Sequence, residues 1–359
     1  MTSNPDPFRR TTSFSARLGT MIVLVALLFT IVGSGSAAQT ASTPWASIDR
    51  SLESLAPQSN LLVAEFRGSS CAAIHGRNES TPLAIASTFK LYVLGELARQ
   101  VQAEEVAWSD GVVLTDDLRS MPSGDYAWVQ AGTVVDIRSL AEAMIWQSDN
   151  TATDHLIDFL GRDNVEEAFA AYGHSDPQSN FPLLMTRELF GIKMSQTAQW
   201  MDRYMTATDE EQAQLLQEQI DPMTINPNAG WGTWNGPTAI DGIEWFASAS
   251  DLCRATASLW SMGAQPGLEP VRDILTGNRG GIEDTSAWPR AGYKAGYEAG
   301  VVNMTFVLER SDGRVFFVSA GYNQPRGAID QSAARAQLTQ VFDCLGVVSG
   351  LRSCADPKG

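Results

Sequence analysis

The sequence predicts an α+β fold in which strands from both ends of the chain form one antiparallel sheet. Two β-rich runs at 61–66 and 70–75 are joined by Arg-Gly-Ser, which is typical of a hairpin. A second hairpin is expected over 301–323, where two β-rich runs flank the turn sequence Ser-Asp-Gly. Between them, from about 105 to 285, the pattern is mostly helical and loop. The sheet is therefore assembled from distant segments around an inserted all-helical lobe.

Helices are expected on both sides of this lobe and within it. A short helix spans 47–55, and an apolar run with helical spacing opens at Ser87. The stretch 135–150 places apolar residues at helical spacing, and 151–161 continues the pattern until a glycine stops it. A closing helix is expected over 331–346. These helices flank the predicted sheet and build the lobe.

The stretch 191–245 stands apart as a lid-like insertion. A polar helix rich in Glu and Gln is expected over 208–220, and 226–246 is rich in Gly, Asn, Pro and Trp. One interpretation is a lid that faces a bound molecule. The favoured interpretation is that the tryptophans anchor a long insertion that has few other apolar groups to bury.

Length, composition and charge limit the classes of protein to consider. The 359 residues allow two domains, or one domain of two lobes. With 44% hydrophobic and 18% charged residues, the chain is globular and not disordered. The formal charge of −16 argues against a nucleic-acid partner, because phosphate binding needs clustered Lys and Arg.

The N-terminus has the pattern of an export signal. Three arginines precede the charge-free apolar run 21–33, and small residues at 34–38 allow cleavage after Ala38. The alternative is a retained membrane anchor, but about 13 apolar residues are fewer than the roughly 20 that span a bilayer. We therefore expect a signal peptide over 1–38, no stable membrane insertion after cleavage, and a folded part outside the cytoplasm.

The cysteines and histidines indicate disulfides and no metal. Cys344 and Cys354 lie ten apart in an exported chain, so a disulfide between them is expected. Cys71 and Cys253 either pair or remain buried thiols. The sequence contains no C-x-x-C pair, and none of its three histidines lies in an H-E-x-x-H motif. A zinc site is not expected, and we predict no cofactor.

Three short strings carry the chemistry of the chain. They are Ser-Thr-Phe-Lys at 87–90, Ser-Asp-Asn at 148–150 and Lys-Ala-Gly at 294–296. In this order they resemble the motifs of class A β-lactamases and penicillin-binding proteins, with the third departing at its middle residue. The resemblance covers about residues 47–346. It implies a two-lobed serine β-lactamase-like fold and a catalytic domain over 47–346, after a linker (39–46) and before a tail (347–359).

Ser87 and Lys90 are the candidate nucleophile and base. A serine hydroxyl needs an adjacent base, and residues three apart on a helix share a face. A lysine works as base only if burial and a neighbouring cation lower its pKa, and Lys294 would supply that charge. The alternative is a helix N-cap and a solvated lysine, but Lys90 stands among apolar neighbours. By resemblance, the backbone N–H groups of Ser87 and Tyr297 form the oxyanion hole.

The resemblance also implies roles for the other two strings. Ser148 would relay a proton to the leaving nitrogen, and Asn150 would bind the side-chain amide of the substrate. The alternative is an ordinary helix start, since Ser, Asp and Asn all favour N-caps. Lys294 supplies a cation and Gly296 a close backbone approach. Ala295 lacks the hydroxyl that normally helps to hold the substrate carboxylate, so substrate preference is expected to depart from that of efficient β-lactamases.

Glu188 is the candidate base for the water that releases the acyl group. It follows a loop-like stretch in the right place, 38 residues beyond Asn150, but lacks the asparagine expected two positions later. The alternative is an acidic residue in the first turn of a helix, which the helix dipole favours. Glu244 is a distant second candidate.

The predicted function is a secreted serine hydrolase that opens β-lactams through a Ser87 acyl-enzyme. The alternatives are a D,D-peptidase or esterase on the same scaffold, or a penicilloyl-binding protein that does not hydrolyse its ligand. The expected partners are a small β-lactam or a cell-wall peptide, and the chain is expected to be a monomer.

Overall fold

The computed structural model describes residues 45–194, 198–223, 236–346 and 354. The expected signal peptide, most of the linker, residues 226–235 of the tryptophan-rich stretch and nearly all of the tail lie outside the described residues. Among the helices within these ranges, none is long and apolar enough to cross a membrane.

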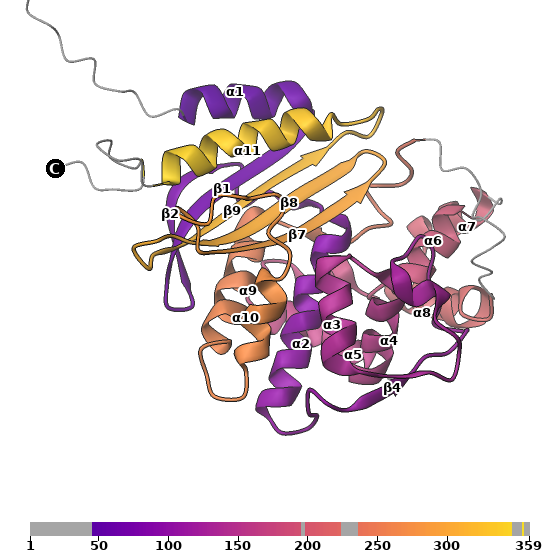
Figure 1. Ribbon diagram of the computed structural model, residues 1–359. Coiled ribbons are helices and arrows are strands. Elements are labelled where there is room, and N and C mark those ends of the chain that lie inside the picture. The colour runs from indigo at the N-terminus through magenta and orange to yellow at the C-terminus, as the bar shows by residue number, and fades with distance from the viewer. Residues whose placement is uncertain (1–44, 195–197, 224–235, 347–353, 355–359) are drawn as a thin grey trace, which may run out of the picture. The chain divides into compact units, whose positions relative to one another are not determined.

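A five-stranded antiparallel sheet in the order β2-β1-β9-β8-β7 forms the centre of the fold (Figure 1). The N-terminal hairpin joins the C-terminal strands through β1 and β9, where Val63 lies opposite Val318. The predicted α+β class and the pairing of distant strands are confirmed. The strands are β1 (Gln58–Arg67), β2 (Ser70–Arg77), β7 (Arg290–Glu298), β8 (Val301–Glu309) and β9 (Val315–Asn323).

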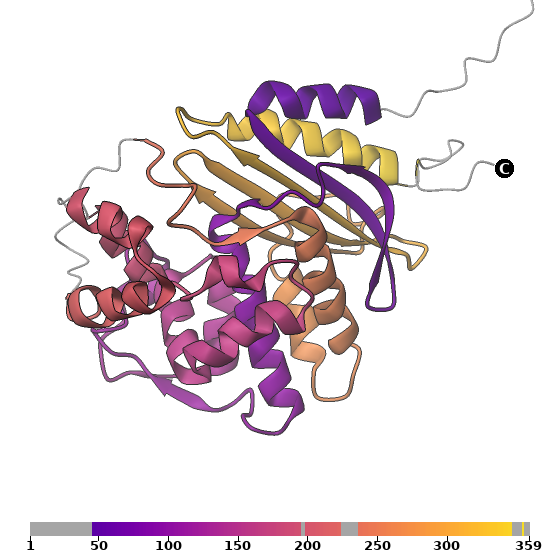
Figure 2. The ribbon, with the colours of Figure 1, turned by 180° about the vertical axis from the view of Figure 1, so that it is seen from behind.

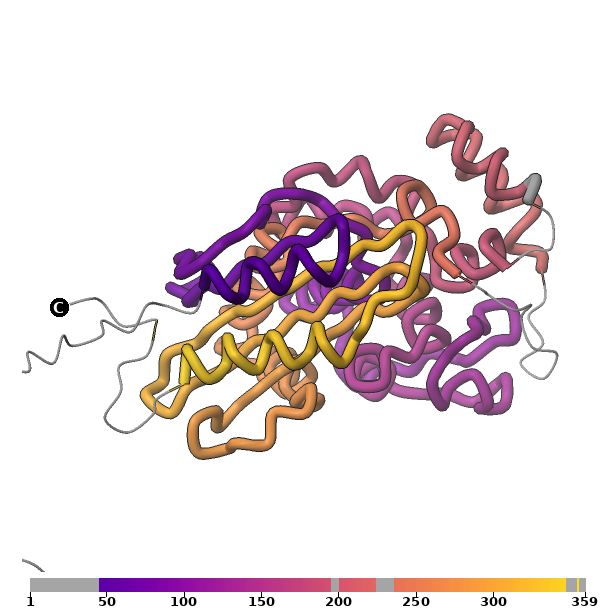
Figure 3. Tube along the Cα trace, turned by 90° about the horizontal axis from the view of Figure 1, so that it is seen from above, coloured from indigo at the N-terminus to yellow at the C-terminus, as the bar shows by residue number. Residues whose placement is uncertain are grey.

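Two terminal helices cover one face of this sheet. Helices α1 (Trp45–Leu55) and α11 (Gln331–Leu345) lie side by side across it, as Figure 3 shows from above. Apolar side chains from both helices pack onto the sheet, and burying them stabilises the arrangement. This core includes Leu52, Val63, Phe306, Phe316 and Leu338.

The helical lobe covers the opposite face, as the view from behind makes plain (Figure 2). Its central helix α2 is buried on nearly every side, which suits a helix that is apolar around most of its circumference. The helices of the lobe are α2 (Lys90–Gln102), α3 (Ile137–Trp146), α4 (Asn150–Leu160), α5 (Arg162–Ala171), α6 (Thr186–Met194), α7 (Ala198–Thr206), α8 (Asp209–Leu215), α9 (Ala249–Met262) and α10 (Glu269–Thr276).

Short elements connect these helices. Two small sheets pair β3 (Leu83–Ala84) with β6 (Phe246–Ala247), and β4 (Gly111–Val113) with β5 (Val134–Asp136). Single 3₁₀ turns are η1 (Ala86–Phe89), η2 (Asp125–Trp128) and η3 (Pro177–Asn180). The polar helix expected over 208–220 is α8 followed by a π-helical turn, η4 (Leu216–Ile220).

Trp245, in the tryptophan-rich stretch, points into the protein. Its ring stacks on Phe89 with the centroids 3.9 Å apart, and its Nε1–H donates to the Leu184 carbonyl at 3.0 Å. Within the described residues this tryptophan acts as an anchor for the insertion. Trp231 and Trp234 lie outside the described residues.

Two disulfides join the four cysteines. The expected Cys344–Cys354 bond closes the C-terminal segment. The second bond pairs Cys71 with Cys253, which the sequence left open, and it ties β2 to α9. The N-terminal hairpin is thereby linked to the helical lobe.

Strand β7 packs directly on the turn η1, backbone against backbone. A Cβ atom added at Gly296 would lie 1.9 Å from the Ile85 carbonyl oxygen and 2.9 Å from the Ser87 nitrogen. No side chain fits between the two segments. The glycine of the third string is therefore required by the close approach of the strand.

We predict that Gly296→Ala pushes β7 away from η1. Overpacking a filled site costs about 1–3 kcal/mol, and the contact here is with rigid backbone. Thermal unfolding should show a clearly lower Tm than the wild type. Gly327→Ala is the matched control, because its Cβ would meet its neighbours at an ordinary 3.6 Å. Equal melting temperatures for the two variants would contradict the packing argument.

Candidate active site

A cavity of about 380 Å³ lies where the edge strand β7 meets the helical lobe. All three motif strings contribute to its wall. Of the eight residues singled out in the sequence, five line this cavity: Ser87, Ser148, Asn150, Lys294 and Tyr297. Lys90 lies fully buried, and Gly296 contacts the turn η1 as described above. Among the described residues, Glu188 is not part of the wall.

Ser87 lies in a single 3₁₀ turn that leads into α2. The sequence predicted a helix opened by Ser87, and the regular α-helix begins three residues later at Lys90. Ala86, just before Ser87, has a φ of 44°, a left-handed conformation that non-glycine residues rarely adopt. Strain of this kind gathers at functional sites, where the surroundings hold it in place.

Lys90 points its amine into the junction between α3 and α4. Its Nζ donates to the Ser148 carbonyl at 2.7 Å, the Asn150 Oδ1 at 2.5 Å and the Ser148 Oγ at 3.3 Å. Burial lowers the pKa of Lys90 to about 7, and the negative charges of Asp149 and Asp154 oppose this shift. A substantial fraction of the amine is therefore neutral near pH 7.

Burial, one of the two causes expected from the sequence, is the main cause of this low pKa. The charge of Lys294, the other expected cause, is not among the main effects on the pKa of Lys90. Lys294 is itself buried, and burial followed by the charge of Lys90 holds the pKa of Lys294 well below its usual range. Desolvation is the largest effect on each lysine because both side chains are buried.

The Ser148 hydroxyl lies between the two lysines. Its Oγ accepts from Lys294 Nζ at 3.0 Å as well as from Lys90. Ser148 has a φ of 60°, so the chain turns sharply between α3 and α4 at this residue. Asp149 caps α4 by accepting the Ala152 N–H at 2.8 Å, and it also accepts the Ser123 hydroxyl at 2.8 Å. Asp149 thus holds the loop from behind.

Asn150 is oriented from both ends of its amide group. The Oδ1 atom accepts from Lys90, and Nδ2 donates to the Pro122 carbonyl at 2.6 Å. A primary amide carries two N–H protons, so one of them is still available to a ligand in the cavity.

Two tyrosines flank Ala295 on the same side of β7. Side chains two apart on a strand share a face, and the hydroxyls of Tyr293 and Tyr297 meet 2.5 Å apart. Both tyrosines line the cavity, and Ala295 is buried. One hydroxyl donates to the other, so the pair keeps one proton for another acceptor.

Glu188 lies in the first turn of α6 and is fully buried. Its Oε2 accepts the Met185 N–H at 2.7 Å, and Oε1 pairs with Arg162 of α5. Burial raises the pKa of Glu188 to about 8, and the charge of Arg162 opposes the shift. These contacts match the alternative that the sequence left open, an acidic residue at a helix start. From α6 it is Phe190 that lines the cavity.

Glu244, the second candidate, lies behind the turn that carries Ser87. Its carboxylate accepts the Ala86 N–H at 3.2 Å and pairs with Lys193 at 3.3 Å. Lys193 also pairs with Glu298 at 2.8 Å. The sequence did not point to Lys193 or Glu298, because 51 and 105 residues separate Lys193 from its two partners and no local pattern links them.

Comparisons with known proteins agree with this arrangement. Residues 58–230 match the model of the beta-lactamase enzyme family. No curated protein matches the chain in sequence. The β-lactamase of Sphaerobacter thermophilus has a similar structure, with 19% identity, a TM-score of 0.59, and coverage of 83% of this chain and 95% of that one.

Two further solved structures share the fold at lower identity. The β-lactamase of Francisella tularensis is 13% identical, with a TM-score of 0.55 and coverage of 83% of this chain and 98% of that one. PBP-A is 15% identical, with a TM-score of 0.52 and coverage of 82% and 94%. At such identities these structures establish the fold alone. The family match over residues 58–230 and the shared fold show that the chain is similar to the β-lactamases and penicillin-binding-protein-like enzymes.

Proposed function

We propose that this chain is a serine enzyme that opens β-lactams through a covalent acyl-enzyme on Ser87. The observation that carries the proposal is the position of the Ser148 hydroxyl, between the amines of Lys90 and Lys294, in the cavity that Ser87 lines. A nucleophile, a neutral amine and a proton relay are the parts that acyl transfer requires.

Acylation uses these groups in a closed proton circuit. Neutral Lys90 takes the proton of the Ser87 hydroxyl while Oγ bonds to the carbonyl carbon of the ring. The backbone N–H groups of Ser87 and Tyr297 stabilise the oxyanion that forms. The ring C–N bond then breaks, and the nitrogen takes the proton of the Ser148 hydroxyl. Lys90 returns a proton to Ser148 across the 3.3 Å contact, so no proton is gained or lost.

Substrate recognition uses the same cavity wall. The amide proton of Asn150 that does not bond to Pro122 can donate to the side-chain amide oxygen of a β-lactam in the cavity. A substrate carboxylate next to Lys294 would raise the pKa of that amine and restore its charge. The tyrosine pair supplies a hydroxyl proton on the side of β7 where Ala295 has none. The carboxylate site is therefore built from different side chains than the motif implies.

A second candidate function is a lasting acyl-enzyme, as in a D,D-peptidase, an esterase or a penicilloyl-binding protein. The specific observation in its favour is that the Glu188 carboxylate is engaged by Arg162 and Met185 N–H and does not line the cavity. Without a carboxylate at the acyl group, the deacylating water lacks a base. Ser87 and Ser148, which acylation uses, line the cavity, whereas the release of the acyl group has no assigned base.

We further propose that the chain is exported and works as a monomer outside the cytoplasm. The arginines before the apolar run 21–33 and the small residues after it support export. The two disulfides suit an oxidising compartment.

A fluorescent penicillin tests the proposed function directly. The wild type should form an adduct that intact-mass spectrometry places on Ser87, and Ser87→Ala should form none while keeping the wild-type Tm. Fast loss of the adduct indicates β-lactamase activity, and a lasting adduct indicates the second candidate. An adduct on the alanine variant would remove Ser87 from the mechanism.

The pKa of Lys90 predicts how acylation depends on pH. Since the base must be neutral, the second-order acylation rate constant should rise about tenfold per pH unit below the pKa. It should level off above about 7, the pKa of Lys90. Lys90→Arg should be nearly inactive because an arginine does not deprotonate. A rate constant that is flat from about pH 5 to 9 would place the base elsewhere.

The position of Glu188 predicts that it does not control release of the acyl group. Both carboxylate oxygens accept N–H groups, one from Arg162 and one from Met185, and the side chain does not line the cavity. Glu188→Gln should therefore leave both acylation and deacylation rates close to those of the wild type in stopped-flow measurements. Accumulation of a trapped adduct in this variant would instead establish Glu188 as the deacylation base.

A further inference from the structure

Three buried ionisable side chains from distant parts of the chain meet behind the turn that carries Ser87. Lys193 lies in α6, Glu244 precedes β6 and Glu298 ends β7. The Lys193 amine donates to Glu298 at 2.8 and 2.9 Å and to Glu244 at 3.3 Å. The side chains of Lys193 and Glu244 are fully buried, and that of Glu298 nearly so. We call this set the buried triad; the acylation steps above use none of its members.

Glu244 holds the backbone immediately before Ser87. Its Oε2 accepts the Ala86 N–H at 3.2 Å and the Trp245 N–H at 3.1 Å. The left-handed conformation of Ala86 costs of order 1–3 kcal/mol for a residue other than glycine. A buried carboxylate on the Ala86 N–H helps to hold the peptide in that conformation. The direction of the next N–H, that of Ser87, follows from it.

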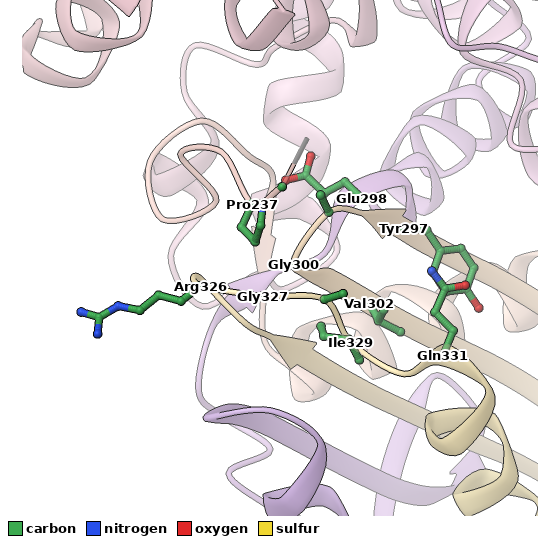
Figure 4. A pocket seen from close by; sticks show the side chains of 12 residues that line it. Pro237, Tyr297, Glu298, Gly300, Val302, Arg326, Gly327, Ile329 and Gln331 are labelled. Atoms are coloured by element: carbon green, nitrogen blue, oxygen red, sulfur yellow. The ribbon is translucent and has the colours of Figure 1, made fainter. Parts of the chain in front are cut away.

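Glu298 holds the strand on the other side of the oxyanion hole. It follows Tyr297 in β7, and Figure 4 shows the two side chains extending to opposite sides of the strand. The Lys193 amine bonds to both acids. It thereby links Glu298, which follows Tyr297, to Glu244, which holds the Ala86 N–H just before Ser87. These hydrogen bonds therefore connect the same two segments, η1 and β7, that are in backbone contact at Gly296.

The charges of the buried triad balance at neutral pH. Burial, followed by the charge of Glu244 and a hydrogen bond to it, raises the pKa of Glu298 well above its usual range, and Lys193 opposes this shift. One proton shared between the two carboxyl groups leaves a single negative charge, which the ammonium of Lys193 balances. A buried ion pair is tolerated when it is paired and hydrogen-bonded in this way, whereas removing one partner leaves a costly unpaired charge.

We propose that the buried triad is a positioning device for the oxyanion hole. It sets the spacing and direction of the Ser87 and Tyr297 N–H groups by holding the residues next to each. This inference rests on the proposed function, because the oxyanion exists only if Ser87 attacks a carbonyl. None of the three residues touches the reacting atoms, so they are positioning residues.

Glu244→Gln is the main test. The amide oxygen can still accept the Ala86 N–H, but without the charge of Glu244 the carboxyl of Glu298 ionises more readily and draws the Lys193 ammonium away from residue 244. Removing one oxyanion-hole donor typically costs about 100- to 1,000-fold in rate, and a misdirected donor should cost about 10- to 100-fold. We expect this loss in the acylation rate constant, with little change in the substrate concentration that half-saturates acylation.

Infrared difference spectroscopy of the acyl-enzyme supplies a readout that a merely structural role would not move. Hydrogen bonds in the oxyanion hole polarise the ester carbonyl, so the wild-type stretch should lie at low wavenumber and that of Glu244→Gln higher. Glu96→Gln is the matched control, because Glu96 is also a buried carboxylate, paired with Arg99 on α2. Its ester stretch should equal that of the wild type, whatever happens to its Tm.

Glu298→Gln sharpens the test. A glutamine mimics the protonated form that the raised pKa of Glu298 favours, so this variant should keep the wild-type stretch and most of its acylation rate. If Glu244→Gln does not fold, Lys193→Gln serves in its place with the same expected shift. A wild-type stretch in the folded Glu244 or Lys193 variant overturns the positioning role. Failure of the wild type to form any adduct overturns the proposed function and this inference with it.

Discussion

The site depends on the direct contact between the backbone of β7 and the turn η1. Gly296 lies against Ile85 and Ser87 with no room for a Cβ atom, so the two segments approach as closely as backbones can. One of these segments is the edge strand of the sheet, and the other opens the central helix of the lobe. The cavity lies at this junction, and its walls come from both. Any shift of the sheet against α2 would move the Ser87 and Tyr297 N–H groups relative to each other.

Burial of ionisable groups around this contact gives the site its chemistry and costs stability. Lys90 and Lys294 are buried side by side, and desolvation lowers the pKa of each. Taking a lysine out of water is unfavourable unless other groups satisfy its N–H donors. The α3–α4 junction satisfies them with the Ser148 carbonyl and the Asn150 amide oxygen. The strained φ at Ala86 and Ser148 adds to this cost. Burial of the apolar cores on both faces of the sheet offsets this cost.

The sequence predicted those parts of the fold and site that depend on local patterns. Alternating apolar residues and turn sequences revealed the two hairpins, and helical spacing revealed α3, α4 and α11. The motif strings led to Ser87, Ser148, Asn150 and Lys294, which the fold brings to one cavity. The sequence did not decide whether Cys71 and Cys253 form a disulfide, because the two cysteines are 182 residues apart. The contacts of Lys193 with Glu244 and Glu298 were not predicted for the same reason, since the residues are far apart in the sequence. No strand was predicted over β7 from the sequence, so the i, i+4 spacing of the two tyrosines did not indicate that they share a face.

The difference between acylation and release explains why one half of the chemistry is easier to read from sequence than the other. Acylation needs a serine, a lysine and a serine relay in fixed mutual geometry, so short strings on helix starts specify it. Release needs only a carboxylate that reaches the acyl group, and any loop near the cavity can supply one. A glutamate in a helix first turn satisfies the sequence pattern equally well when it caps the helix and pairs with an arginine, as Glu188 does with Arg162. The direction in which that carboxylate points is decided by the ion pair with Arg162 of α5 and by the packing of α6 against α4. That packing is a tertiary property which no motif records, and it separates a hydrolase from a protein that keeps its acyl group.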